Sequence, residues 1–288
     1  MRIHIAFSIL TVLAVAACGS PPAPHTYTLQ GQVLAVAPDH QQATIKHEEI
    51  KGFMAAMTMA YKMKDPQQLN GIGPGDLINA TLVVETNGAF VTDVKKVGEA
   101  PLEKATTETP TASSGFELLK PGDPVTDANF VDQNGKKKPF SAFKGAPLAI
   151  TFMYTSCPLP DFCPLMDRNF AAVQQTIESD PELKKVHLVS ISFDPVTDTP
   201  AVLKKHASEL KADPARWTFL TGDRDEIDKF ASRFGMAIAR SQTDPVNITH
   251  TLRTAIVDAD GKVVKVYTGN EWKPDQVVAD LKAIAPAK

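Results

Sequence analysis

The chain is short of several features that would assign it to a common functional class. Its 288 residues carry a net charge of −3, so it lacks the excess of Lys and Arg that marks a nucleic-acid-binding protein. It has no glycine-rich phosphate loop and no serine in a nucleophile-elbow motif. It contains only three cysteines, Cys18, Cys157 and Cys163, which narrows the places where thiol chemistry can occur.

No apolar run near the N-terminus is long enough to span a membrane, but residues 1–17 are typical of a signal peptide. Arg2 supplies a positive charge before the thirteen-residue apolar stretch Ile5–Ala17. The stretch ends Val-Ala-Ala-Cys18, which resembles the lipobox of bacterial lipoproteins and implies a lipid on Cys18 after cleavage. The alternative is ordinary signal cleavage, with Cys18 incidental. Either way we expect an exported protein, and the first interpretation predicts a membrane-anchored lipoprotein facing the periplasm.

Export leaves Cys157 and Cys163 as the two cysteines free for chemistry in the mature chain. An exported compartment is oxidising, so these thiols would form a disulfide unless a reductant or a metal ion keeps them apart. Two neighbouring thiols can exchange electrons as a dithiol/disulfide pair or bind a soft metal ion as thiolates.

Composition and periodicity predict two domains. Residues 18–25 are Pro-rich and form a tether, and residues 26–98 contain five short predicted strands, typical of a small OB-like β-barrel that is closed or partly open. Residues 99–114 are rich in Thr, Glu, Pro and Ala and are predicted to be a flexible linker. Residues 115–288 alternate strand and helix patterns, which predicts a mixed α/β domain with helices on both faces of its sheet.

Methionine and histidine side chains gather between residues 47 and 59. Met57 and Met59 are two residues apart, a spacing that places both thioethers on one face of a strand. Thioethers together with the imidazole of His47 suit Cu(I) better than any hard cation, and a thioether cannot be lost to a disulfide. The alternative is that Met57, Met59 and Met63 are ordinary core residues, because methionine commonly fills irregular gaps in a core.

Residues 43–97 resemble the periplasmic copper-binding domain of the CusF type. The matching segments are Thr44–His47, Met57–Met59 and Gly75–Asp76. The resemblance implies that His47, Met57 and Met59 hold Cu(I) or Ag(I). The family commonly places a Trp three residues before the first of these methionines as a cation–π cap. That position is Met54 here, so the aromatic cap is missing and Met54 could supply a third thioether.

The cysteine pair lies between a predicted buried strand, residues 147–153, and a predicted helix, residues 167–179. Five residues separate Cys157 from Cys163, whereas thioredoxin-type enzymes use a Cys-X-X-Cys motif that presets the dithiol geometry. Asp161 inside this loop adds a negative charge, which would raise a thiol pKa rather than lower it. These residues alone leave metal binding and dithiol exchange both open.

The second half of the chain resembles the Sco/SenC family of copper-binding, thioredoxin-fold proteins. The matching motifs are Thr155–Pro158, Cys163–Pro164, Ile191–Pro195, Asp198–Pro200, Trp217–Gly222, Thr249–His250 and Val257–Gly261. The resemblance implies a thioredoxin-like fold and one copper ion, Cu(I) or Cu(II), held by Cys157, Cys163 and His250. It also implies a role in building the CuA centre of cytochrome c oxidase, by delivering copper, by reducing the target's cysteines, or both. The five-residue cysteine gap departs from the family's usual three.

The sequence therefore predicts an envelope copper chaperone with a Met/His site and a Cys/Cys/His site. Its expected partners are copper ions, the CuA subunit of cytochrome c oxidase or another periplasmic copper protein, and the membrane through its lipid; no nucleic acid is expected. Two alternatives stay open. The chain could be a thiol-disulfide oxidoreductase acting through Cys157 and Cys163, or a copper-buffering or resistance protein that delivers to no target.

Other polar residues are expected to have structural roles. Asp194, Asp198 and Asp223 fall at turns and helix starts, where Asp is common as a cap, so we do not expect a hard-metal site there. His187 and His206 fit ordinary strand-edge and helix-surface positions.

Overall fold

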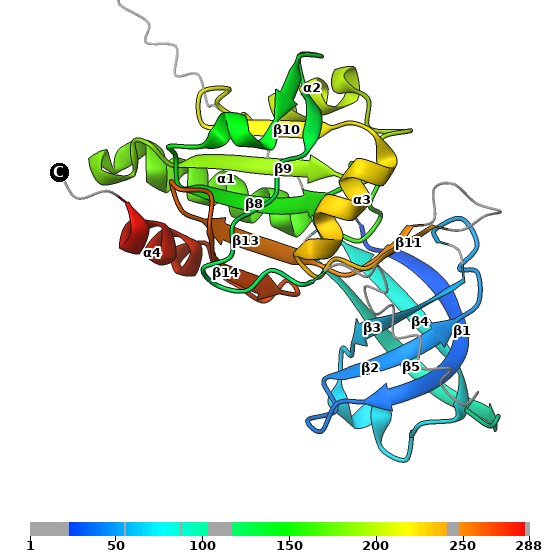
Figure 1. Ribbon diagram of the computed structural model, residues 1–288. Helices are drawn as coiled ribbons and strands as arrows, with labels where there is room; N and C mark the ends of the chain where they lie inside the picture. Colours follow the sequence, from blue (N-terminus) through cyan, green and yellow to red (C-terminus); the bar gives the residue numbers. More distant parts are fainter. Residues whose placement is uncertain (1–22, 55, 87, 103–116, 241–247, 286–288) are drawn as a thin grey trace, which may run out of the picture.

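The structure is a computed structural model that describes residues 23–54, 56–86, 88–102, 117–240 and 248–285. These residues form an N-terminal domain of antiparallel strands and a C-terminal domain of helices and strands (Figure 1). The predicted mixed fold class is confirmed. The predicted signal peptide with Cys18, and most of the predicted linker, lie outside the described residues. No helix in the described part of the chain is both long and apolar enough to cross a membrane.

Five antiparallel strands in the order β3-β2-β1-β4-β5 form the N-terminal domain. They are β1 (His25–Val36), β2 (Gln42–His47), β3 (Met57–Lys62), β4 (Asp76–Glu85) and β5 (Gly88–Glu99). Among the described residues, the two outer strands are joined by a single bridge, between Met63 and Val91. The domain is therefore a barrel-like sheet that stays open between β3 and β5.

The side-chain alternation of β3 explains how this domain acquires its core. Met57, Met59 and Tyr61 point inward, while the residues between them are exposed. Gly31 of β1 allows the sheet to close tightly on this side, because a Cβ at this position would lie 2.5 Å from the backbone oxygen of Lys46 on β2. The inward side chains of all five strands thus meet in one apolar cluster.

The C-terminal domain is built on a seven-stranded sheet in the order β14-β13-β8-β9-β10-β6-β7. The strands are β6 (Asn129–Asp132), β7 (Lys137–Pro139), β8 (Leu148–Met153), β9 (His187–Ser192), β10 (Trp217–Thr221), β13 (Arg253–Val257) and β14 (Val263–Thr268). The central strands β8, β9 and β10 run parallel, and the outer pairings are antiparallel. Every residue of β8 is buried, as expected for a strand covered on both faces.

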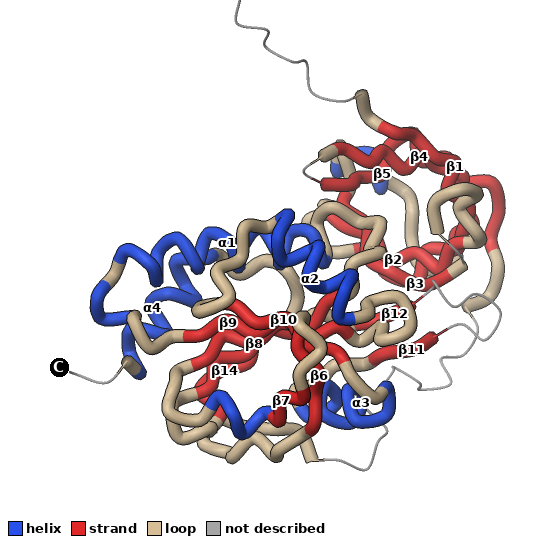
Figure 2. Tube along the Cα trace, turned by 90° about the horizontal axis from the view of Figure 1, so that it is seen from above, coloured by secondary structure: helices blue, strands red, loops and turns tan. Residues whose placement is uncertain are grey.

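Helices α1 (Cys163–Ser179), α2 (Pro200–Glu209) and α4 (Pro274–Ile284) lie on one face of this sheet, and α3 (Arg224–Arg233) lies on the other (Figure 2). Phe170 of α1 lies 5.8 Å from Trp217, between ring centroids, on the first face. Phe230 of α3 lies 6.4 Å from Phe152 on the second. The predicted arrangement of helices on both faces is therefore present.

Two local features differ from the sequence predictions. The first helix begins at Cys163, four residues before the predicted start, because Pro164 fits the first turn, where its missing N–H costs nothing. A separate two-stranded sheet of β11 (Ile238–Arg240) and β12 (Ile248–His250) was not predicted, because both strands are only three residues long. This small sheet carries His250 at its end.

Candidate metal centres

Both cysteines of the C-terminal domain lie where β8 leads into α1. Cys163 is the first residue of the helix and is 1% exposed, while Cys157 is half-buried in the preceding loop; both are free thiols. The loop is held by the buried Asp198, whose carboxylate accepts hydrogen bonds from the Thr155 backbone N–H at 3.0 Å, from the Thr155 hydroxyl and from the Ser192 hydroxyl at 2.5 Å. Asp198 thus has the structural role expected of it.

The two thiols have opposite electrostatic environments. A hydrogen bond with Cys163 is the largest cause that holds the pKa of Cys157 well below its ordinary value; burial opposes it and a hydrogen bond with His250 adds to it. Burial raises the pKa of Cys163 well above its ordinary value, and the neighbouring Cys157 raises it further. The site therefore favours one thiolate, on Cys157, stabilised by a neutral thiol. A thiolate is the form that attacks disulfides and binds metal ions.

His250 reaches this thiol from β12. Its Nδ1 lies 3.0 Å from the backbone oxygen of Thr251, and because a carbonyl oxygen only accepts, Nδ1 carries the proton. The other ring nitrogen, Nε2, is left for the contact with Cys157 and can bind a metal ion once it carries no proton, an arrangement common among metal-binding histidines. The ring is packed between aromatic side chains, 4.6 Å from Phe193 and 5.6 Å from Tyr154 between centroids. The structure thus brings Cys157, Cys163 and His250 together around Cys157.

These three side chains do not yet form a finished coordination shell. Across the described ranges, no three His, Cys, Asp or Glu side chains are close enough to hold a metal ion as they stand. Cys157 is the common neighbour, so binding an ion requires His250 and Cys163 to close on it. The chemistry of the donor set, two sulfurs and one imidazole, suits copper in either oxidation state.

The N-terminal domain holds the second candidate set. His47 and Met57 face each other directly in the pairing of β2 with β3, and Met59 lies two residues further along the same face. The Nδ1 of His47 donates to the backbone oxygen of Glu48 at 2.7 Å, while its buried Nε2 has no hydrogen-bond partner in the described part of the chain. Burial lowers the pKa of His47 despite that hydrogen bond, so the ring stays neutral as a ligand must.

Met54 also belongs to this cluster, but its sulfur already has a neighbour. The Tyr61 hydroxyl donates to Met54 Sδ at 3.7 Å, and the Tyr61 ring lies 5.6 Å from the His47 ring, edge to face. Met54 and Tyr61 are both buried, whereas Met57 and Met59 are half-buried. The structure therefore places His47, Met57 and Met59 on one inward-facing patch, with Met54 and Tyr61 beside it. Tyr61 was not singled out in the sequence, where it differs from any core tyrosine only by its period-two spacing from the methionines.

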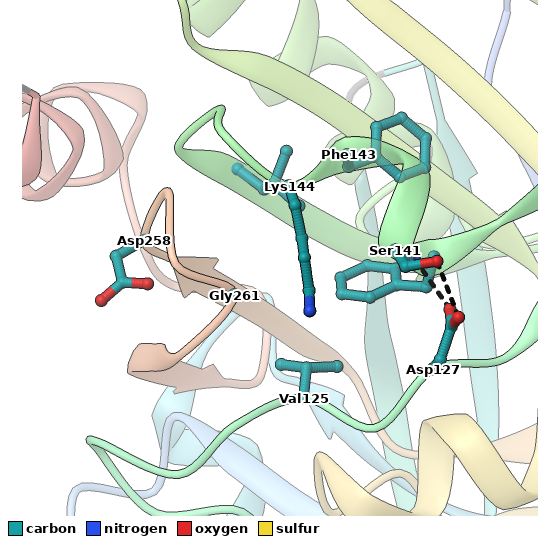
Figure 3. A pocket seen from close by; sticks show the side chains of 9 residues that line it. Val125, Asp127, Ser141, Phe143, Lys144, Asp258 and Gly261 are labelled. Atoms are coloured by element: carbon teal, nitrogen blue, oxygen red, sulfur yellow. Dashed lines mark hydrogen bonds between the residues drawn. The ribbon is translucent and has the colours of Figure 1, made fainter.

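A cavity in the C-terminal domain is chemically unlike these sites. It has a volume of about 100 Å³, and its lining includes Asp127, Ser141, Lys144 and Asp258 (Figure 3). The Ser141 hydroxyl donates to Asp127 at 2.7 Å, and the Lys144 side chain extends toward Val125. The described residues that line it carry no sulfur or imidazole, the ligands that a soft metal ion prefers.

Comparisons with known proteins agree with the chemistry of both sites. Residues 120–286 match the family model of SCO1/SenC, and residues 26–96 match that of the copper binding periplasmic protein CusF. A SCO1 protein homolog from Bacillus subtilis is 32% identical over 166 residues, which covers 57% of this chain and 84% of that protein. Both families bind copper.

Two solved structures are similar to the C-terminal domain. One is a SCO1/SenC family lipoprotein from Bacillus anthracis, 29% identical, which covers 59% of this chain and 99% of that chain with a TM-score of 0.52. The other is BsSco, a Sco family cytochrome c oxidase assembly protein described with a disulfide switch. It is 29% identical and covers 60% of this chain and all of that chain with a TM-score of 0.50. The thioredoxin-like fold implied by the resemblance is thereby confirmed.

Proposed function

Because the chain belongs to the SCO1/SenC family, whose members bind copper and are linked to cytochrome c oxidase assembly, we propose that it is an envelope copper chaperone for the CuA centre. In this proposal copper is the cargo, carried by Cys157, Cys163 and His250. The observation that carries it is the contact of the Cys157 thiol with both Cys163 and His250. Those two contacts link soft-ligand side chains that are far apart in the sequence, which supports the proposed site.

The proposal includes a second Cu(I) site in the N-terminal domain, formed by His47, Met57 and Met59, with Met54 as a candidate third thioether. Its support is the buried Nε2 of His47, which has no hydrogen-bond partner among the described residues, on a residue paired directly with Met57. A neutral imidazole with thioethers binds Cu(I) without releasing a proton. This site can therefore capture copper while the cysteines are oxidised.

An anaerobic Cu(I) titration of the reduced chain from Ser20 tests both sites. We expect two equivalents to bind to the parent, and one equivalent to bind to Cys157→Ser, to His250→Ala and to Met57→Ala, each of which disables one site. His25→Ala, at an exposed position of β1, is the matched control and should keep both equivalents. If Cys157→Ser still binds two equivalents, the proposed C-terminal site is wrong. If Met57→Ala still binds two equivalents, the proposed N-terminal site is wrong.

Thiol-disulfide exchange is the second candidate, because the lowered pKa of Cys157 beside a neutral Cys163 also suits a reductant of the target's cysteines. The discriminating measurement uses an oxidised CuA-loop peptide with and without copper on the chaperone. Reduction of the peptide at stoichiometric yield by the copper-free protein assigns this activity. If the protein transfers copper to a pre-reduced peptide, its function is copper delivery. If it neither reduces the oxidised peptide nor transfers copper, copper buffering is the remaining function.

The location of the protein is part of the proposal. We propose that Cys18 carries a lipid that anchors the chain at the periplasmic side of a bacterial membrane. Cys18→Ala should move the protein from the membrane fraction to the soluble fraction. A variant that stays in the membrane fraction would overturn the lipid anchor, and copper titration of the same material would still test the two metal sites.

A further inference from the structure

The five residues between the cysteines form a contact between the two domains. We call residues 158–162 the docking segment. Its Leu159 is 7% exposed and belongs to the apolar cluster of the N-terminal domain, and Phe162 packs against the clusters of both domains. In both views the β11 edge of the C-terminal domain lies beside the N-terminal domain (Figures 1 and 2). A loop that belongs to the C-terminal copper site thus completes the core of the other domain.

The docking segment is fixed on the side of the C-terminal domain. Asn270 donates its side-chain N–H to the Asp161 backbone oxygen at 2.6 Å, and Arg168 donates to the Pro160 backbone oxygen at 2.8 Å. These bonds leave the Leu159 side chain facing the N-terminal domain. Across the interface, the Lys62 ammonium of β3 lies 3.8 Å from the Asp161 carboxylate. The ion pair therefore joins the segment to β3, the strand that carries Met57 and Met59, and apolar packing joins it to the core of the same domain.

The two candidate metal sites share this interface. Leu159 lies in the same cluster as Met54, and the half-buried Met57, Met59 and Cys157 all pack against that cluster. A copper ion that passes from the thioethers to the thiols can therefore cross an apolar contact inside one molecule. The covalent connection adds to this, because a short link gives one site an effective concentration of about millimolar near the other.

We propose that the docking segment holds the N-terminal domain on the cysteine loop so that Cu(I) passes directly from the Met/His site to the Cys/Cys/His site. This inference rests on the proposed function of the two sites. In the transfer, the bonds from Cu(I) to the His47 imidazole and the thioethers break, and bonds to the sulfurs of Cys157 and Cys163 form. Each thiol that still carries a proton releases it to water, and the ion stays monovalent. Thiolates bind Cu(I) more strongly than thioethers, which sets the direction.

The five-residue cysteine spacing has a physical role in this proposal. Cys157 and Cys163 must both contact one ion, so the residues between them are forced outward as a loop. With Leu159 and Phe162 in that loop, the outward bulge presents apolar surface that the N-terminal domain covers. A target protein that approaches Cys157 would meet this covered loop, and must displace the N-terminal domain or bind beside it.

The test is anaerobic stopped-flow mixing of the reduced chain from Ser20 with one equivalent of weakly chelated Cu(I). The appearance of Cu(I)–thiolate absorption in the ultraviolet reports arrival at the cysteines. In the parent we expect a transfer phase whose rate does not depend on protein concentration. Leu159→Asp places a charge in the apolar contact, and Lys62→Glu sets two like charges at the ion pair; each should slow this phase about tenfold or more and make it depend on protein concentration.

The matched control is Lys95→Glu, which makes the same charge change at an exposed position of β5 away from the docking segment and should keep the parent rate. Small-angle X-ray scattering provides a copper-free readout, in which both docking variants should have a larger radius of gyration than the parent and the control. Parent transfer rates in Lys62→Glu and Leu159→Asp would overturn the proposal. If those variants still bind two equivalents of Cu(I), the proposed function stands; if the parent itself binds none, that function fails too.

Discussion

His47 stands directly opposite Met57 in the pairing of β2 with β3, and its buried Nε2 finds no hydrogen-bond partner among the residues that the structure describes. A buried polar atom without a partner costs about 1–3 kcal/mol, so a protein keeps one where something else satisfies it. The neighbouring side chains offer thioether sulfur and a tyrosine hydroxyl that is already engaged with Met54. A soft metal ion accounts for this arrangement better than core packing alone.

Met57→Leu separates a ligand from a core residue, because it removes a sulfur and preserves most of the volume. We expect Cu(I) affinity at the N-terminal site to fall about tenfold or more, while the free energy of unfolding changes by less than about 1.5 kcal/mol. Met63→Leu is the control, since Met63 is buried at the bridge to β5 and is not a proposed ligand. Competition with a chromophoric Cu(I) chelator measures both. Equal affinities in the two variants would mean that Met57 is a core residue.

The cysteines should differ in reactivity when the metal-free, reduced protein is alkylated. Cys157 is half-buried with a pKa held below its ordinary value, whereas Cys163 is 1% exposed with a raised pKa. We expect iodoacetamide to modify Cys157 at least about tenfold faster at neutral pH, because the thiolate is the nucleophile. Peptide mass spectrometry after short reaction times measures the ratio. His250→Ala should lower the Cys157 rate, and preferential labelling of Cys163 would contradict the assignment.

The strand and helix order was predictable because local signals agreed with the tertiary context. The run Leu148–Met153 is apolar throughout, and the structure buries it on both faces. The alternation in Met57–Lys62 likewise predicted one inward face, and the structure shows that face. Short elements were missed, as β11 and β12 were, since three residues carry no periodicity to detect.

Long-range contacts were predictable only where a family resemblance linked distant residues. The approach of His250 to Cys157 came from resemblance, not from spacing. The covering of Leu159 by the N-terminal domain had no sequence signal, because a Leu between two prolines resembles any loop residue. His187 and His206 lie at a strand end and on a helix, as expected, but the sequence did not predict their half-buried positions or their hydrogen-bond partners. His187 bonds the Thr218 hydroxyl at 2.8 Å, and His206 bonds the buried Asp167 at 3.0 Å.

Asp198→Asn tests the support of the cysteine loop. The substitution replaces one acceptor oxygen with an NH₂ group, so a donor from Thr155 or Ser192 would face another donor. We expect the C-terminal domain to lose about 1–3 kcal/mol of unfolding free energy. Tryptophan fluorescence in urea reports this domain alone, because Trp217 and Trp272 are the two tryptophans of the chain. Asp223→Asn is the control, because Asn is as good a helix N-cap as Asp; a loss of equal size there would contradict the special role of Asp198.

His187 should make the stability of the C-terminal domain depend on pH. Burial and, to a smaller extent, the nearby Lys138 lower its pKa to about 4. The unfolded chain has an ordinary histidine pKa of about 6.5, so below that pH the unfolded state binds a proton that the folded state refuses. The stability that the neutral His187 contributes to the folded state is therefore complete above a pH of about 6.5 and is lost as the pH falls toward 4. We expect a loss of about 2–3 kcal/mol at a pH of about 4.5.

His187→Gln isolates this contribution from the carboxylates that titrate over the same range. Gln cannot gain a proton, so the stability difference between parent and variant should be larger at neutral pH than at a pH of about 4.5, by about 2–3 kcal/mol. Urea unfolding followed by tryptophan fluorescence at both pH values measures it. His25→Gln, at an exposed position in the other domain, should track the parent at both. If the parent and His187→Gln differ in unfolding free energy by the same amount at both pH values, the folded protein accepts a proton on His187 as readily as the unfolded chain does.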